Sequence, residues 1–280
     1  MSSIKTLLVT GVSSGFGRAL AIEAITAGHR VIGTVRNESA RQAFEALGPS
    51  QAFGRLLDVT DFGRIDAAVA EMESTLGPID VLVNNAGYGH EGIFEESSLE
   101  EIRQQFEVNV FGAVAVTKAL LPYLRQRRRG HIINITSMGG FITFPGVADY
   151  CGSKFALEGI SEALGKELRP FNIAVTAVAP GSFRTDWAGR SMVRSPRSIA
   201  DYDALFEPIR AAREAKSGKQ LGDPAKAARA MLALIASEQP PAHLLLGSDA
   251  LTLVREKLTS YAAELDTWEA LTRSTDFDSD

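Results

Sequence analysis

The chain has 280 residues with 34 acidic and 29 basic side chains, which gives a formal net charge of −5 at pH 7. The only basic run, residues 127–129, follows a predicted helix and is typical of a solvated helix end, so we expect no nucleic-acid partner. No apolar run approaches the roughly 18 to 20 residues of a membrane span, and the single cysteine, Cys151, fits a reducing compartment. These features predict a soluble cytoplasmic protein.

The first predicted strand, residues 5–10, runs into a glycine-rich turn. The strand is rich in leucine and β-branched residues and apolar on both faces, which is typical of a central parallel strand. Three glycines let the backbone turn tightly against a pyrophosphate, whose charge would face the N-terminus of a helix at 18–27. A strand, glycines and a helix in this order predict a dinucleotide site formed by Gly11, Ser13, Ser14, Gly15, Phe16 and Gly17.

The end of the second predicted strand, residues 29–35, bears on the choice of cofactor. A site that prefers NAD usually places a carboxylate there, whereas the 2′-phosphate of NADP suits a guanidinium. Arg36 follows this strand with no acid beside it, and Arg18 after the glycine turn is a second candidate. Arg36 is alternatively an ordinary surface arginine. We predict a preference for NADP(H) and leave NAD(H) possible.

Two further strand ends extend the same site. A predicted strand at 52–57 ends in Asp58 and Val59, where an aspartate is by itself more often a turn residue or a helix cap than a ligand. The strand at 81–83 ends in the motif Asn-Asn-Ala-Gly at 84–87. Because ligands of open α/β sheets bind at the carboxyl ends of the strands, small residues there allow close approach of the nucleotide. We assign the floor of the cofactor site to Asn85, Ala86 and Gly87.

Candidate catalytic residues follow in the second half of the chain. A predicted helix at 99–128 contains Asn109, a poor helix former that is equally well a tolerated polar residue. The predicted strand at 131–136 ends in Ser137, and an isolated serine after a strand is usually a turn or a cap. At a strand end its hydroxyl is alternatively placed to bond a substrate oxygen.

Tyr150 and Lys154 lie four residues apart at the start of a predicted helix, 150–169, and therefore on one face of it. A fixed ammonium near a phenol favours the phenolate, so we expect Lys154 to bring the pKa of Tyr150 from about 10 toward neutral. A phenol with such a pKa serves as a general acid or base. Taken alone, the pair is more often an amphipathic helix start with a solvated lysine.

The Gly-x-x-x-Gly-x-Gly turn and the Tyr-x-x-x-Lys pair together resemble the short-chain dehydrogenase/reductase family, over residues 4–250. Asn109, Ser137, Tyr150 and Lys154 match that family's catalytic tetrad in order and spacing. The resemblance implies that Tyr150 exchanges a proton with a substrate oxygen held by Ser137. It also implies that Lys154 stabilises the phenolate and contacts the nicotinamide ribose, while Asn109 diverts its helix and positions a water of a proton relay.

The same resemblance implies further cofactor contacts. Asp58, with Val59 beside it, would accept from the adenine amino group, and Asn84 would mainly steady the sheet. After a predicted strand at 173–178, the residues that would contact the nicotinamide are Pro180, Gly181 and Thr185.

Residues 182–222 are predicted to form an irregular substrate lid, because a long loop inside a compact domain is usually functional or disordered. We expect a mainly apolar substrate pocket, although aromatic residues in such loops are alternatively core anchors. The residues behind this expectation are Trp187, Met192 and Phe206 in the lid and Phe141, Phe144 and Val147 before Tyr150.

Motifs at 180–186 and 244–250 resemble the branch similar to 17β-hydroxysteroid and retinol dehydrogenases. That resemblance implies hydrophobic alcohols and ketones as substrates. The predicted function is NADP(H)-dependent interconversion of a hydrophobic secondary alcohol and its ketone, or of a primary alcohol and its aldehyde, with Tyr150 as general acid or base. Two alternatives are an NADP(H)-binding sensor or scaffold without turnover, and a lyase or epimerase that uses the nicotinamide only transiently.

We predict one doubly wound α/β domain of the Rossmann type over residues 1–280, with seven parallel strands in the order 3-2-1-4-5-6-7. A helical extension is expected at about 249–272. The family resemblance implies homodimers or homotetramers that pair through the helices at 99–128 and 150–169. We expect no metal site, since four histidines without ligand spacing are interpreted as surface or loop residues: His29, His90, His131 and His243.

Overall fold

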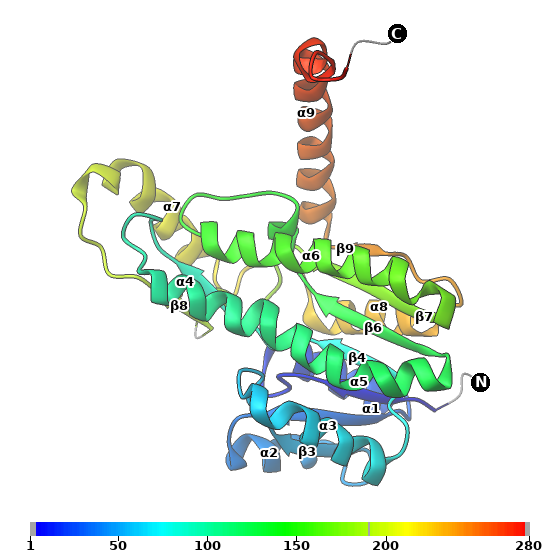
Figure 1. The fold of residues 1–280 in the computed structure, drawn as a ribbon. Coiled ribbons are helices and arrows are strands. Elements are labelled where there is room, and N and C mark those ends of the chain that lie inside the picture. The colour runs from blue at the N-terminus through cyan, green and yellow to red at the C-terminus, as the bar shows by residue number, and fades with distance from the viewer. Residues whose placement is uncertain (1–3, 190, 278–280) are drawn as a thin grey trace.

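The computed structural model describes residues 4–189 and 191–277, so residue 190 of the predicted lid and the two ends of the predicted domain lie outside the described residues. Its central feature is a parallel sheet in the order β3-β2-β1-β4-β6-β7-β9 (Figure 1). Counted within this sheet, the order is the predicted 3-2-1-4-5-6-7, which is therefore confirmed. The strands are β1 (Thr6–Val9), β2 (Arg30–Val35), β3 (Ala52–Leu56), β4 (Val81–Asn84), β6 (Gly130–Ile135), β7 (Ile173–Pro180) and β9 (His243–Leu246).

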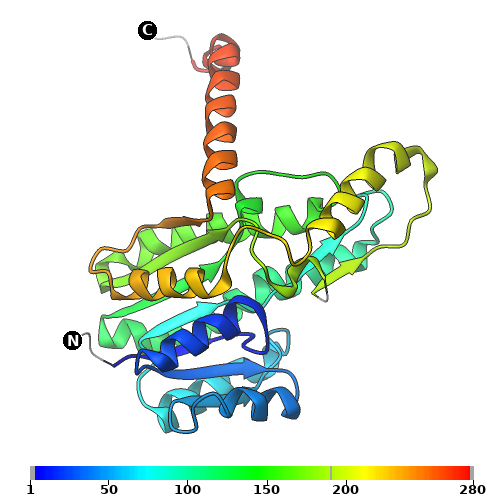
Figure 2. The ribbon, with the colours of Figure 1, turned by 180° about the vertical axis from the view of Figure 1, so that it is seen from behind.

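Helices cover both faces of the sheet (Figures 1 and 2). One face carries α1 (Gly15–Thr26), α2 (Glu38–Glu45) and α8 (Pro224–Ala236), and the other carries α3 (Phe62–Leu76), α5 (Ala113–Arg127) and α6 (Ala148–Leu168).

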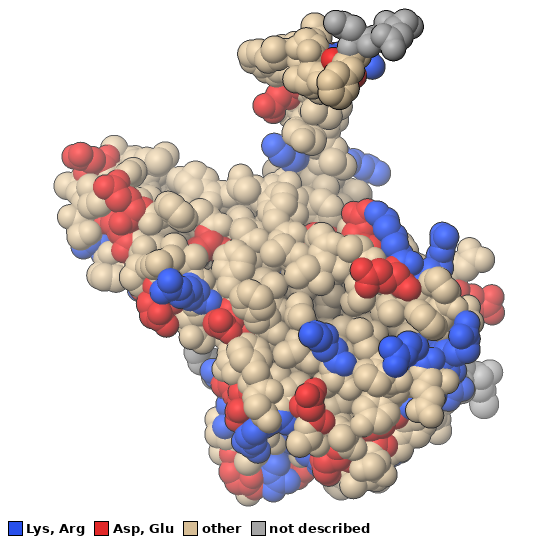
Figure 3. All heavy atoms as spheres, in the orientation of Figure 1, with Lys and Arg blue, Asp and Glu red and all other residues tan. Residues whose placement is uncertain are grey.

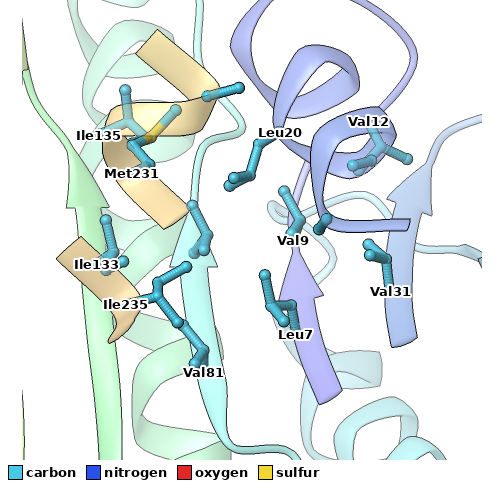
Figure 4. Packing of buried hydrophobic residues seen from close by; sticks show 14 of the residues in the cluster. Leu7, Val9, Val12, Leu20, Val31, Val81, Ile133, Ile135, Met231 and Ile235 are labelled. Atoms are coloured by element: carbon cyan, nitrogen blue, oxygen red, sulfur yellow. The ribbon is translucent and has the colours of Figure 1, made fainter. Parts of the chain in front are cut away.

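Successive residues of β1 point to opposite faces, as a strand that is buried on both sides requires. Leu7 and Val9 pack in one core cluster and Leu8 in the other. Full burial of each leucine contributes about 2 kcal/mol. Figure 4 shows part of the first cluster, which joins β1 to α1 and α8 through Leu20, Met231 and Ile235.

The predicted helix at 99–128 is not continuous. It consists of α4 (Leu99–Phe106), a wide π turn η1 (Glu107–Gly112) and α5. Ser98 caps α4 in a capping box with Glu101. Asn109 lies inside the π turn, the position at which a diversion of the helix is predicted.

The predicted lid is ordered rather than irregular, so that part of the prediction is wrong. It contains β8 (Met192–Arg194), which pairs in parallel with β5 (Gly89–Glu91), and the helix α7 (Asp203–Lys216). Strand pairing across a hundred residues, together with ion pairs to Glu91 in β5 and to Glu96 after it, organises this region. Such long-range partners leave no local signal in the sequence.

The C-terminal helix α9 (Ser248–Arg273) is the predicted helical extension, and it projects from the body beside the edge strand β9 (Figures 1 and 2). None of the helices described for residues 4–189 and 191–277 is long and apolar enough to cross a membrane. On the face shown in Figure 3, basic and acidic side chains are intermixed, without a patch of one sign.

Candidate active site

A cavity of about 1250 Å³ lies at the carboxyl ends of the parallel strands, where the predicted site residues gather. Ser137 lines it together with all the predicted cofactor-site residues except Gly17: Gly11, Ser13, Ser14, Gly15, Phe16, Arg36, Asp58, Val59, Asn85, Ala86, Gly87, Tyr150, Lys154, Pro180, Gly181 and Thr185. Of the proposed tetrad, only Asn109 lies behind the cavity wall.

The glycine turn after β1 leaves the start of α1 open toward the cavity. Gly11 and Gly15 have φ values of 72° and 57°, a conformation that favours glycine. The first-turn amides of α1 have no intrahelical acceptor, and the N-cap Ser14 makes no side-chain cap to them. This end of α1 therefore fits a pyrophosphate.

Gly17 supports the turn from behind instead of contacting the cavity. A Cβ at this position would lie 2.3 Å from the carbonyl oxygen of Gly11 and 2.4 Å from Nδ2 of Asn85. The prediction of Gly17 as a cofactor contact is thus not supported by its position, because its lack of a side chain serves close packing.

The two asparagines after β4 have different surroundings. Asn84 is buried and donates to Thr117 Oγ1 at 2.9 Å and to Asn134 Oδ1 at 2.8 Å, so it links β4 to the neighbouring strand β6 and to helix α5. Asn85 Nδ2 donates to the carbonyl oxygens of Thr10 and Gly11, each at 2.9 Å. Asn85 therefore fixes the glycine turn from below while facing the cavity.

Arg36 and Asp58 line the part of the cavity at which the adenosine contacts are predicted. Arg36 is exposed at the end of β2, and among the described residues its guanidinium has no hydrogen-bond or ion-pair partner. Asp58 Oδ1 accepts from the amide and the hydroxyl of Thr60, at 3.0 and 2.8 Å. Asp58 is therefore a turn residue in this structure that also faces the cavity.

Ser137 and Tyr150 face each other in the deeper part of the cavity. Ser137 follows β6 and accepts from the amide of Gly139 at 3.0 Å, while Tyr150 lies in the first turn of α6 and is 8 % exposed. Burial raises the pKa of Tyr150 to about 12, against the opposing effect of its hydrogen bond with Ser137. The side chains of the protein alone thus hold the phenol in its protonated form.

Lys154 does not lower the pKa of Tyr150 as predicted. Its Nζ lies 5.8 Å from the centroid of the Tyr150 ring and donates to the carbonyl oxygen of Ile135 at 2.9 Å. Burial lowers the pKa of Lys154 to about 8, against the charge of Glu158, so its ammonium is itself destabilised. Burial is the largest cause of the shift in each pKa, which is why spacing on a helix gave the wrong direction.

Asn109 braces the segment that follows β4. Its Oδ1 accepts from the amide of Tyr88 at 3.1 Å, and its Nδ2 donates to the Tyr88 carbonyl at 3.1 Å and to Ser153 Oγ at 3.3 Å. A Cβ on Gly87 would lie 3.0 Å from Asn109 Oδ1 and 3.8 Å from Lys154 Nζ, so both side chains flank the same backbone. The water contact implied for Asn109 stays a prediction.

The loop after β7 forms the part of the cavity wall at which the nicotinamide contacts are predicted. Asp249, at the start of α9, accepts from the amide of Ser182 at 2.8 Å, and its Oδ1 would lie 2.2 Å from a Cβ on Gly181. Gly181 is therefore required by the carboxylate behind it. Thr185 caps a short turn through Trp187 and reaches the cavity wall.

Comparisons with known proteins agree with this geometry. The family model for short chain dehydrogenases matches residues 5–193. The chain belongs to the short-chain dehydrogenase family. It is an NAD(P)-dependent oxidoreductase related to the retinol dehydrogenases.

Three relatives of this short-chain dehydrogenase illustrate the likeness. The oxidoreductase BOA17 of Botryotinia fuckeliana is 35 % identical over 95 % of this chain and 97 % of its own length. Retinol dehydrogenase 8 of Homo sapiens is 35 % identical over 85 % of this chain and 79 % of its own. The crystal structure of a short-chain dehydrogenase from Streptomyces avermitilis matches with a TM-score of 0.92 and 44 % identity, over 99 % of this chain and 100 % of that one.

The substrate side of this short-chain dehydrogenase is partly apolar. Phe144, Val147 and Trp187 pack around Tyr150 and line the cavity, with the Trp187 ring 5.1 Å from the tyrosine ring. Other predicted pocket residues are core anchors outside the cavity lining. Phe141 lies against His243, Met192 is buried below Gly89, and Phe206 is buried against Gly146.

The interpretation of the histidines as surface or loop residues is wrong for His90 and His131, which are buried in β5 and β6. His29 lies in the loop before β2, as predicted, although it is buried there, and His243 is half-buried in β9 beside Glu158. No group of three or more metal-binding side chains lies together in the part of the chain that the structure describes, and the absence of a metal site stays a prediction.

His90 forms a buried network that the sequence did not indicate. Its Nδ1 lies 2.5 Å from Asp149 Oδ2, and its Nε2 lies 3.0 Å from Ser195 Oγ. Burial lowers the pKa of His90, but the hydrogen bond to Asp149 and the charges of Asp149 and Glu101 outweigh it and raise the pKa overall. Asp149 lies in the first turn of α6 and is buried, and its position directly before Tyr150 does not by itself show that a histidine from β5 would pair with it.

Proposed function

We propose that this protein is an NADP(H)-preferring oxidoreductase that interconverts a hydrophobic secondary alcohol and its ketone, or a primary alcohol and its aldehyde. Tyr150 is proposed as the general acid and base. The observation that supports this best is that Ser137, Tyr150 and Lys154 line the cavity into which the open end of α1 points.

A bound nicotinamide supplies or accepts the hydride at the reacting carbon. With a pKa raised to about 12, Tyr150 is protonated at neutral pH and can donate its proton to a carbonyl oxygen that is being reduced. Ser137 holds that oxygen near the phenol. Lys154, with its pKa lowered to about 8, is mostly protonated at pH 7, and its positive charge stabilises the phenolate as it forms, which suits proton donation in the reductive direction.

Arg36 supports the proposed preference for NADP(H). Its guanidinium stands at the adenosine end of the cavity, and the adjacent Asn37 accepts from the amide of Ala40 to cap α2. The nearest acid in sequence, Glu38, is bonded to Arg41 and Gln42. The end of β2 therefore offers a positive charge for a 2′-phosphate and no unengaged carboxylate for the ribose hydroxyls.

The apolar wall formed by Phe144, Val147 and Trp187 supports a hydrophobic substrate, as does the relation to retinol dehydrogenases. Cys151 is buried and is a free thiol in this structure, which fits a reducing compartment such as the cytoplasm.

The test is an assay of the purified chain against hydrophobic ketones and aldehydes with NADPH and with NADH, following nucleotide absorbance. We expect turnover with NADPH, and loss of about 10²- to 10⁴-fold of it in Tyr150→Phe with nucleotide affinity nearly unchanged. Tyr123→Phe, on α5 away from the cavity, is the matched control. Tight nucleotide binding without turnover across the panel would favour a sensor or scaffold instead.

A further inference from the structure

The outer part of α9 carries a regular stripe of exposed apolar side chains. The row runs Leu251, Val254, Leu258, Tyr261, Leu265 and Trp268, with alternating steps of three and four residues. Val254 is buried at the base of the helix, whereas the other five are each at least 40 % exposed. Such a row with an average step of 3.5 residues is the pattern of a two-helix coiled coil.

Beyond its base, α9 has no packing partner among the described residues. Figures 1 and 2 show it rising away from the body, and β9 is the only element with which it makes extended contact. A helix in water gains most of its stability by packing an apolar face, and a long exposed stripe with two aromatic residues marks a docking surface.

We propose that this stripe pairs with α9 of a second copy of the chain in an antiparallel coiled coil. The helix has 26 residues, which gives it a length of about 39 Å and room for three heptads. In the antiparallel register, Leu258 of each copy packs against Tyr261 of the other, and Trp268 at the tip packs against Leu251 at the base. The two bodies then lie at opposite ends of the pair.

The charges beside the stripe select the antiparallel direction. In that register Lys257 of one copy lies next to Glu264 of the second copy, and the twofold axis generates this pair twice. In a parallel register Glu264 would instead lie next to Glu269 of the second copy, which repels. Within the described chain Lys257 only lies over the Tyr261 ring, and Glu264 has no ion-pair partner, so both remain available.

The same charges argue against a membrane surface as the occupant. Helices that lie on membranes are rich in lysine and arginine on their polar face. Helix α9 carries five acidic residues against three basic ones. A second copy of this chain, with complementary charges, is the better partner.

The first experiment measures the native mass of the full chain by light scattering. We expect Leu258→Lys/Leu265→Lys to halve the mass of the wild-type assembly. Ser260→Lys/Thr267→Lys adds the same two charges to the other side of α9 and should leave the mass unchanged. A monomeric wild-type chain, or an unchanged mass in the first variant, would overturn the proposal.

The second experiment tests direction without altering the apolar row. Glu264→Lys should raise the Kd of the α9 pairing about tenfold, because it places two lysine pairs in contact. Adding Lys257→Glu should restore the wild-type Kd. Tighter association of Glu264→Lys would show a parallel pair, and no change in either variant would show that α9 packs elsewhere; both results contradict the antiparallel model.

A third measurement addresses the membrane. We expect the wild-type chain not to co-sediment with vesicles of phosphatidylcholine and phosphatidylserine. Sedimentation that is lost in Leu258→Lys/Leu265→Lys would assign the stripe to lipid and refute the self-pairing.

Discussion

The cofactor side and the substrate side of the cavity are built by different means. On the cofactor side, backbone groups and small residues at strand ends form the wall, and Gly11, Gly17 and Asn85 pack against one another with no room for larger side chains. On the predicted substrate side, ion pairs hold the segment for which a lid is predicted, residues 182–222. Buried Glu91 pairs with Arg194 at 3.0 Å and also with Arg213.

The cofactor side of the cavity therefore tolerates few changes of side chain, whereas the predicted substrate side tolerates more. Backbone packing fixes the shape of the nucleotide site, because any added atom meets main chain. The predicted lid is held by ion pairs between side chains of β5, β8 and α7, so its side chains can change without a clash with the main chain. Arg197 adds three further ion pairs, with Glu96, Asp203 and Glu207. Changes on the two sides should therefore alter different measured quantities, the nucleotide Kd and the substrate KM.

The largest effect on the cofactor side is expected from Gly17→Ala. Its Cβ would meet the Gly11 carbonyl at 2.3 Å, so the turn must distort, which costs about 1–3 kcal/mol of stability and should remove detectable NADPH binding by calorimetry. Gly159→Ala is the control, since its Cβ meets nothing within 4 Å. Wild-type nucleotide affinity in Gly17→Ala would contradict the claim that close packing of the backbone fixes the shape of the nucleotide site.

Arg36→Asp should change nucleotide choice without affecting the lid. Loss of a charge-assisted contact with the 2′-phosphate is worth about 1.5–3 kcal/mol, so the Kd for NADPH should rise at least about tenfold while that for NADH changes little. Arg18→Asp is the comparison, because Arg18 does not line the cavity. An unchanged preference in Arg36→Asp would move the phosphate contact to another residue.

On the substrate side, Glu91→Gln should loosen the lid. Replacing the buried carboxylate leaves Arg194 and Arg213 without its charge, at a cost of about 2 kcal/mol in the free energy of unfolding. We expect a higher substrate KM with an unchanged nucleotide Kd. Glu207→Gln removes a half-exposed partner of Arg197 and should have little effect. An altered nucleotide Kd in Glu91→Gln would contradict the claim that changes on the two sides of the cavity affect different quantities.

The smallest expected effect is a pH dependence carried by His90. Its pKa in the folded protein is raised above 6.5, so protonated His90, facing Asp149, Glu101 and Ser195, stabilises the lid fully below about pH 6.5. That contribution is lost as the pH rises through the folded pKa. His90→Asn should therefore flatten the decline of thermal stability above pH 6.5, and an unaltered slope would show that His90 stays neutral.

The sequence predicted the cofactor side of the cavity better than the predicted substrate side. The glycine turn, the strand order and the approach of Ser137 to Tyr150 were predictable, because strand ends of a parallel sheet meet at one edge and each motif is local. The helix α7 and the His90 network were not, because their partners lie about a hundred residues away in sequence. The pKa of Tyr150 was predicted in the wrong direction, since its spacing from Lys154 says nothing about burial.

Asp249 gives α9 a mechanical connection to the active site. Its carboxylate accepts a hydrogen bond from the Ser182 amide and fills the space beside Gly181. The base of α9 is therefore bonded to the first residue of the predicted lid. We therefore expect a displacement of α9 to move the backbone at Gly181 and Ser182, where the nicotinamide contacts are predicted. If α9 of one copy pairs with α9 of a second copy, a movement at the cavity of one copy is expected to act on the cavity of the other.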